Sequence, residues 1–138
     1  MYKRQQYIRR RASGKVNIQL DAPQGKNVEA MISPPLFAWV IENLLKNALD
    51  AIGGSGNIDI SINKQGKQTF IDIKDSGKGI PPGKLKTVFQ PGYSTKKRGW
   101  GLGLSLAKRI VEEFHKGKIF VKESQVGKGT TFRIMFRR

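Results

Sequence analysis

The chain has 138 residues, of which 38% are hydrophobic, and this suits one domain with a buried core. The absence of cysteine excludes disulfides and thiolate metal sites, and no apolar run is long enough to cross a bilayer. The formal net charge of +16 indicates an anionic partner such as a nucleotide, nucleic acid, anionic lipid or acidic protein. We expect no specific nucleic-acid binding, because stacking aromatics interleaved with basic residues are not evident.

Residues 1–14 are basic and polar, and we interpret them as a linker or the tail of a preceding helix, with the folded domain spanning residues 15–138. They do not resemble a signal peptide, since no apolar core follows the basic residues. Beyond them, alternation of apolar and polar residues is typical of half-buried strands. It predicts strands over 16–20, 57–63, 69–74, 118–123 and 130–137, with a short edge strand over 28–32.

Three segments have the features of helices. The first begins at Ser33-Pro34-Pro35 and runs to Ile52, with Gly53-Gly54 as its stop. A short helix opened by prolines is predicted over 81–88, and a third over 102–114 with apolar residues, including Phe114, at helical spacing. Helices between antiparallel strand pairs predict an α+β fold, a two-layer sandwich whose mixed, largely antiparallel sheet is covered on one face by three helices.

The first predicted helix carries polar side chains beside its apolar face. At about 100° per residue, Asn43, Asn47 and Asp50 fall within about 60° of one another. An amide oxygen suits Mg²⁺, a metal that keeps several waters and shares phosphate oxygens as ligands. The pattern therefore indicates a magnesium–phosphate site, and it equally fits a solvated polar face.

A glycine-rich stretch precedes the third predicted helix, at Gly99, Gly101 and Gly103. Glycine lets the backbone approach a ligand, and a helix N-terminus presents free N–H groups at the positive end of its dipole. The stretch fits a phosphate-binding turn and also a plain helix start after a flexible loop. It does not match the dinucleotide fingerprint, because no clear strand precedes it.

Five short motifs resemble the boxes of the ATP-binding domain of sensor histidine kinases and occur in that family's order over about residues 16–136. The same fold is shared by type II topoisomerases, mismatch-repair ATPases and a heat-shock chaperone. The motifs are Asn43-x-x-x-Asn47-Ala48-x-Asp50-Ala51 (N box), Asp75-x-Gly77-x-Gly79-Ile80 (G1 box), Phe89-x-Pro91-Gly92-Tyr93-Ser94-Thr95-Lys96 (F box), Gly99-x-Gly101-Leu102-Gly103-Leu104 (G2 box) and Gly127-x-Gly129-Thr130 (G3 element).

The resemblance implies a site for ATP with Mg²⁺ as its metal. It makes Asn47 the Mg²⁺ ligand and places Asn43 close to the phosphates or the waters of the metal. Asp50 would line the pocket near the base, although many relatives carry a basic residue there. Asp75 would accept from the exocyclic amine of adenine, assisted by Thr130. The remaining implied nucleotide contacts are Gly77, Gly79, Ile80 and Phe89.

The resemblance also makes residues 89–100 a short lid over the triphosphate. Lys96 is the expected γ-phosphate contact and completes a catalytic set with the two asparagines, while Ser94 or Thr95 assists. Trp100 has no assigned role. The base of the lid would consist of Gly99, Gly101, Leu102, Gly103 and Leu104.

Position 43 separates two activities within the resembled superfamily. Its ATPases carry at this position a glutamate that activates water, whereas the Asn43 amide cannot accept a proton. We therefore expect a protein-histidine kinase domain that passes the γ-phosphoryl group to a histidine on a separate dimerisation domain, in two-component signal transduction. An ATP-hydrolysing or serine-kinase member of the same fold is the alternative.

The only histidine, His115, is expected at the surface or as a helix C-cap rather than as a phosphoacceptor. The chain would then be a monomeric, cytoplasmic catalytic fragment whose residues 1–14 follow the missing dimerisation and phosphoacceptor domain. A response regulator would be the downstream partner. Any membrane anchor, such as one in the inner membrane, would lie in other parts of the parent protein.

Overall fold

A computed structural model describes residues 6–9, 16–21, 34–91 and 103–137 of the chain. Within these residues, six strands form one sheet in the order β1-β2-β3-β4-β6-β5. β2 and β3 are parallel, and all other neighbouring pairs are antiparallel, so the sheet is mixed and largely antiparallel as predicted. The strands are β1 Gln6–Arg9, β2 Val16–Asp21, β3 Gly56–Gln65, β4 Gln68–Asp75, β5 Lys118–Gln125 and β6 Gly129–Arg137.

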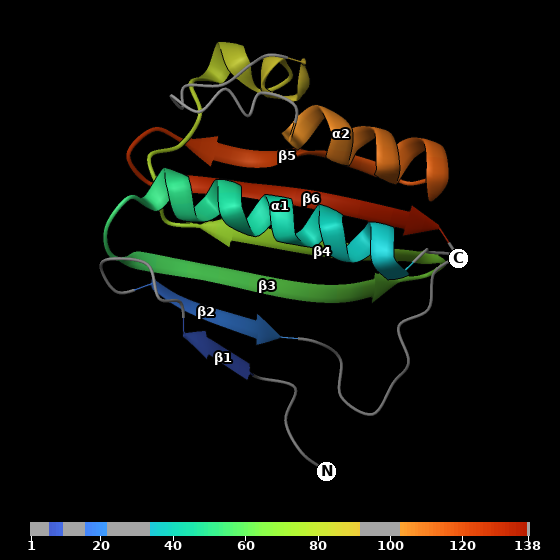
Figure 1. Cartoon of the computed structure of the whole chain (residues 1–138), viewed down its shortest axis with the longest axis horizontal. Helices are drawn as coiled ribbons and strands as arrows, with labels where there is room; N and C mark the ends of the chain where they lie inside the picture. The colour runs from blue at the N-terminus through green and yellow to red at the C-terminus, as the bar shows by residue number, and fades with distance from the viewer. Residues whose placement is uncertain (1–5, 10–15, 22–33, 92–102, 138) are drawn as a thin grey trace.

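The helices lie side by side on one face of this sheet (Figure 1). α1, Pro34–Ile52, packs on β3 and β4, while α2, Gly103–Arg109, continues into a π-helical turn, η3, Ile110–Phe114, that contacts β5. The predicted short helix over 81–88 is replaced by two 3₁₀ turns, η1 Pro82–Lys84 and η2 Thr87–Phe89. Prolines without N–H donors and a glycine of low helix propensity leave only single turns there.

The hydrophobic core fills the space between the sheet and the helices. α1 contributes Val40, Leu44 and Ala48 at a spacing of four residues, and each is at most 2% exposed. Alternate strand residues meet them from the sheet, because successive strand side chains point to opposite faces. Burying one large aliphatic side chain stabilises the fold by about 1.5–3 kcal/mol. The most buried hydrophobic strand residues are Ile18, Ile58, Ile73, Phe132, Ile134 and Phe136.

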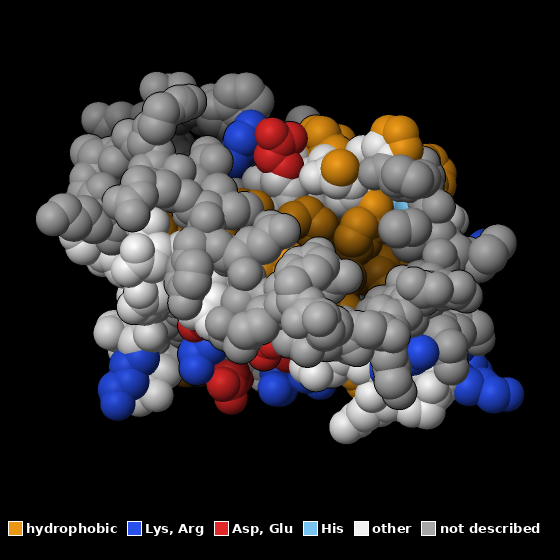
Figure 2. Space-filling model, turned by 90° about the horizontal axis from the view of Figure 1, so that it is seen from below, with side chains coloured by type: hydrophobic (Ala, Val, Ile, Leu, Met, Phe, Trp, Pro, Cys, Tyr) orange, Lys and Arg blue, Asp and Glu red, His pale blue; other side chains and the backbone are white. Residues whose placement is uncertain are grey.

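The opposite face of the sheet mixes polar and apolar side chains, and no helix of the described residues packs on it. Arg133 of β6 donates two hydrogen bonds to Asp72 of β4, at 2.7 and 2.8 Å, and this pairing raises the pKa of Arg133. The Arg133 guanidinium also lies 4.6 Å from the ring centroid of Phe70. Figure 2 shows the molecule from below the view of Figure 1. Most of the charged side chains visible there lie along the helix-free face of the sheet, and the hydrophobic side chains lie toward the helices.

β1 was not among the predicted elements, and it lies within residues 1–14, which were predicted as a linker outside the folded domain. It pairs antiparallel with β2, and Ile8 lies opposite Ile18. Its alternation of polar and apolar residues covers only four positions, too few to stand out from the surrounding basic residues. The edge strand predicted over 28–32 lies outside the described residues.

The end of the α2–η3 helix reverses two burial predictions. Phe114, predicted to continue the apolar stripe, is 63% exposed, whereas His115, predicted at the surface, is 5% exposed. A π turn holds one more residue than an α turn, so the inward position moves from four to five residues after Ile110. The Nδ1–H of His115 donates to the carbonyl oxygen of Ile110 at 3.0 Å, and its ring packs edge-on against Phe37 and Phe136.

Candidate functional site

The polar row of α1 forms one side of the candidate site. Asn43 is half-buried beside the core stripe, and its Nδ2 donates to the carbonyl oxygen of Trp39 at 2.9 Å. Its Oδ1 faces the start of α2, because a Cβ added to Gly103 would lie 3.2 Å from it. The structure therefore brings the N box together with the G2 box.

Further along α1, Asn47 is half-buried and Asp50 is exposed. Both asparagines border the buried stripe, as the helical periodicity predicted. Glu42 is exposed on a different side of the helix. The helix axis advances by about 12 Å from residue 43 to residue 51. The polar side chains of α1 therefore form a row of this length, called the polar track.

Asp75, the last residue of β4, lies at the far end of this track. It is 3% exposed, and the backbone N–H of Gly77 donates to its Oδ1 at 2.8 Å. Burial raises the pKa of the Asp75 carboxyl, while hydrogen bonds from the N–H groups of Gly77 and Thr130 act in the opposite direction. A buried carboxylate with these partners is a hydrogen-bond acceptor well suited to a ligand amine.

The loop after Asp75 is held against the C-terminal end of α1. The N–H of Lys78 donates to the carbonyl oxygen of Ala51 at 3.1 Å. A Cβ on Gly77 would come within 2.7 Å of the Ala51 carbonyl group, closer than real Cβ contacts. Only glycine allows this approach, so the G1 glycine at position 77 packs the adenine-binding candidate Asp75 against the N-box helix.

The turn between β5 and β6 closes the same end. Thr130 of β6 lies opposite Asp75 of β4 and is 4% exposed. The Ile80 N–H donates to Oγ of Ser124 at 2.8 Å, and that Oγ lies 2.7 Å from Oγ1 of Thr130. Ser124 was not predicted as a site residue. One serine just past the predicted strand over 118–123 carries no signal of such a role, which depends on contacts across the sheet.

The remaining predicted residues fall into three groups. Phe89 is 8% exposed and packs edge-on against Phe132, and Leu104 packs on the core, so both support the fold. Gly79 has a positive φ of 81° beside the β5–β6 turn. The others lie outside the described residues and stay predictions: Ser94, Thr95, Lys96, Gly99, Gly101 and Leu102.

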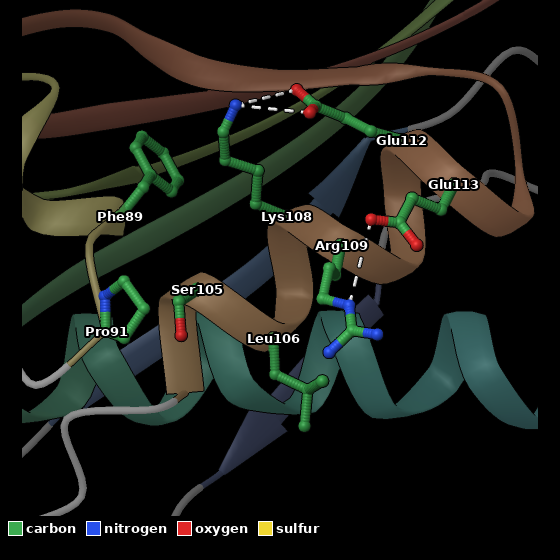
Figure 3. Close-up of a pocket in the computed structure, with 8 residues that line it drawn as sticks. All are labelled: Phe89, Pro91, Ser105, Leu106, Lys108, Arg109, Glu112 and Glu113. Atoms are coloured by element: carbon green, nitrogen blue, oxygen red, sulfur yellow. Dashed lines mark hydrogen bonds and ion pairs between the residues drawn. The ribbon is translucent and has the colours of Figure 1, made fainter.

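A groove with a cavity volume of about 390 Å³ lies on the outer side of α2 (Figure 3). Lys108 pairs with Glu112 at 3.0 Å along one wall, and Arg109 pairs with Glu113 at 3.7 Å. Phe89 is the one predicted nucleotide contact in its lining, and the groove includes neither Asn47 nor Asp75, the proposed metal and base contacts. It is lined by Phe89, Pro91, Ser105, Leu106, Lys108, Arg109, Glu112 and Glu113.

The donor set fits magnesium that is shared with a ligand. Among the described residues, no group of three or more His, Cys, Asp or Glu side chains could hold a metal ion. The amide oxygens of Asn43 and Asn47 offer neutral oxygen donors on one side of α1. Mg²⁺ bound through such donors takes its other ligands from water and phosphate oxygens.

Comparison with known families decides the classification. A family profile described as histidine kinase-, DNA gyrase B- and HSP90-like ATPase matches residues 32–138. The chain belongs to this ATPase family. The match spans all the described motif residues of the candidate site, from the asparagines of α1 to Thr130.

Among the curated proteins similar to this chain, one is named a sensor histidine kinase and another a sporulation kinase. The sensor histidine kinase ZraS of Escherichia coli strain K12 is 42% identical over 106 residues, covering 77% of this chain and 22% of that protein. Sporulation kinase C of Bacillus subtilis strain 168 is 41% identical over 96 residues, covering 70% of this chain and 22% of that protein. The chain thus spans about a fifth of the length of these relatives.

Solved structures of histidine kinases have a similar fold. The catalytic domain of the histidine kinase ThkA superimposes with a TM-score of 0.76 at 26% identity, over 88% of this chain and 78% of that one. A complex of ThkA with the response regulator protein TrrA matches with a TM-score of 0.73 at 24% identity, over 88% and 34% of the two chains. This member of the ATPase family therefore has the fold of a histidine kinase catalytic domain. None of the helices in its described part has the length and apolarity needed to cross a membrane.

Proposed function

We propose that this domain binds Mg-ATP and donates the γ-phosphoryl group to a histidine on a separate dimerisation domain, in two-component signal transduction. The proposal is carried by one arrangement: α1 holds Asn43 beside Gly103 at one end of its polar track and receives the Asp75 loop at Ala51 at the other. Phosphate-side and base-side groups of the proposed site thus meet the same helix.

Each group has a role that follows from its chemistry. Asp75 accepts from the exocyclic amine of adenine, whereas guanine presents an oxygen at that position. Asn47 holds Mg²⁺, and Asn43 orders the phosphates or the waters of the metal. Bound Mg²⁺ would neutralise charge on the phosphate oxygens, and Lys96 would add a positive charge at the γ-phosphate.

Transfer rather than hydrolysis is supported by the N box. The Asn43 amide has no basic site for a water proton, and its Nδ2 is committed to the Trp39 carbonyl. Glu42, the adjacent carboxylate, is exposed on another side of the helix. Phosphoryl transfer to a positioned imidazole needs alignment and charge neutralisation, which this site can supply without a base.

The partners of the domain follow from this reaction. The acceptor is the dimerisation domain of the same parent protein, and a response regulator takes the phosphoryl group next. ThkA, solved with its response regulator, is a structural precedent. We place the domain in the cytoplasm as a monomer, with any membrane anchor in other parts of the parent.

Calorimetric titration tests nucleotide binding. ATP and a non-hydrolysable ATP analogue should bind with Mg²⁺ and more weakly without it, and GTP should bind worst. Asn47→Ala should remove most of the Mg²⁺ dependence, while Glu42→Gln, one residue from the polar row, should leave it intact. Equal affinity for GTP, or no affinity for ATP, would exclude the proposed site.

Phosphoryl transfer needs a second experiment. The domain is mixed with the dimerisation domain of its parent protein and radiolabelled Mg-ATP. Acid-labile phosphohistidine on the added domain is the expected product, with free phosphate released much more slowly. Fast release of free phosphate would favour an ATPase, and acid-stable label on serine would favour a serine kinase.

A further inference from the structure

We propose that Ser124 is a positioning residue that determines adenine specificity by setting the direction of the proton on Thr130. The inference rests on the proposed function, because it concerns the base end of the same nucleotide site. Ser124 lies outside all five motifs, on β5. Its hydroxyl joins the loop after Asp75 to the start of β6.

Three contacts define this position. Oγ of Ser124 accepts from the N–H of Ile80 at 2.8 Å and lies 2.7 Å from Oγ1 of Thr130. The same oxygen lies 3.2 Å from the carbonyl oxygen of Gly129, a distance longer than usual for a hydroxyl donor. Ser124 is half-buried and Thr130 is 4% exposed, so bulk water does not readily replace either partner.

Proton counting leaves two arrangements for the pair. A hydroxyl has one proton and two lone pairs, and the Ile80 N–H occupies one lone pair of Ser124. When Ser124 donates to Thr130, the Thr130 proton is available to a ligand. When Ser124 donates to the Gly129 carbonyl instead, Thr130 donates to Ser124 and offers the ligand only an acceptor.

The first arrangement matches adenine. Its Watson–Crick edge has a donor, the exocyclic amine, next to an acceptor, the ring nitrogen N1, and guanine has the reverse order. Asp75 as acceptor and Thr130 as donor, opposite each other on β4 and β6, present the complementary pattern. The weak alternative partner of Ser124, the Gly129 carbonyl at 3.2 Å, makes it easy for a bound adenine to select this arrangement.

The test compares ATP with 1-deaza-ATP, which lacks the N1 acceptor and keeps the amine. Titrations use the whole domain and the variants Ser124→Ala, Ser124→Thr, Thr130→Val and the Ser124→Ala/Thr130→Val double variant. Ser124→Ala removes the donor that orients the Thr130 hydroxyl, so it should weaken ATP several-fold and 1-deaza-ATP far less, because only ATP uses the Thr130 proton at N1. The double variant should lose no more than Thr130→Val, because the two hydroxyls act as one unit.

Controls separate positioning from folding. Ser124→Thr keeps the hydroxyl and should restore the preference for ATP over 1-deaza-ATP. Arg133→Lys perturbs the ion pair with Asp72 on the far side of the sheet, and it should leave the ratio of the two affinities unchanged. If Ser124→Ala does not fold, Ser124→Cys provides the same comparison with a weak donor.

Three results would overturn the inference: equal losses for the two nucleotides in Ser124→Ala, additive losses in the double variant, or no rescue by threonine. These differ from failure of the proposed function. If the unmodified domain binds no ATP, the nucleotide site itself is wrong. If it binds Mg-ATP selectively and the Ser124 variants behave like it, only the role of Ser124 is wrong.

Discussion

Asn43 faces Gly103: the amide oxygen of Asn43 lies 3.2 Å from the place where a Cβ on residue 103 would stand. The other end of the amide is held by the Trp39 carbonyl at 2.9 Å. The side chain therefore lies between the Trp39 carbonyl of its own helix and the first residue of α2.

Gly103→Ala should reduce Mg-ATP affinity about 10-fold without destabilising the fold. The new methyl group would push the Asn43 amide by a few tenths of an ångström, while alanine favours a helix over glycine by up to about 1 kcal/mol. Titration calorimetry and thermal unfolding measure the two effects. Gly83→Ala is the control, because nothing lies within 4 Å of its added Cβ. Unchanged affinity in Gly103→Ala would show that the Asn43 position does not matter for binding.

Asp75→Asn should change stability and binding in opposite directions. Burial raises the pKa of Asp75, so the native state holds a proton that the unfolded chain releases as pH rises above about 4. This contribution to stability is present at low pH and is lost as pH rises through the native pKa. At pH 7 the variant should unfold at an equal or higher temperature than the unmodified domain, and this advantage should disappear near pH 3.

Binding by the same variant should fall by about 10- to 100-fold for ATP and much less for GTP, because an amide can present a donor where adenine needs an acceptor. Asp59→Asn, at an exposed position of β3, is the matched control for both measurements. An Asp75→Asn domain that loses stability at pH 7 and keeps its preference for ATP would contradict the assignment.

Thr69→Val should stabilise the domain by about 1 kcal/mol. Thr69 is 1% exposed, and its Oγ1 is the one buried side-chain polar atom of the described residues that has no hydrogen-bond partner. Valine keeps the shape and removes the cost of burying an unpaired hydroxyl. Urea unfolding measures the change. Thr131→Val, also buried (5% exposed) but on the opposite face of the sheet, serves as comparison, and a loss of stability in Thr69→Val would reveal a partner for that hydroxyl.

His115→Ala should cost about 2–4 kcal/mol of unfolding free energy, because it removes a ring packed between Phe37 and Phe136. Phe114→Ala should cost less than about 1 kcal/mol, since Phe114 is 63% exposed. The reverse order would mean that the helix ends without a π turn. The folded His115→Ala domain should still phosphorylate an added dimerisation domain, because the buried imidazole is not the acceptor.

The helix Pro34–Ile52 and the strand pairs could be predicted from the sequence because their side chains repeat with the period of the backbone. The half-buried position of Asn43 and Asn47 follows from the same periodicity. The π turn at Ile110–Phe114 could not be predicted this way. The π turn inserts one residue into the helical register. Which residue then points inward depends on packing of His115 against the rings of Phe37 and Phe136, which lie far away in the sequence.

The sequence by itself determined the fold class, the family and the order of motifs, because periodic burial and glycine-rich boxes are local properties of the chain. Only the tertiary structure decided which side chains meet. Gly77 against Ala51, Asn43 against Gly103 and Ser124 against Thr130 are contacts between distant segments. Such contacts depend on how helices and strands pack, and the distances between them are set by the whole core at once.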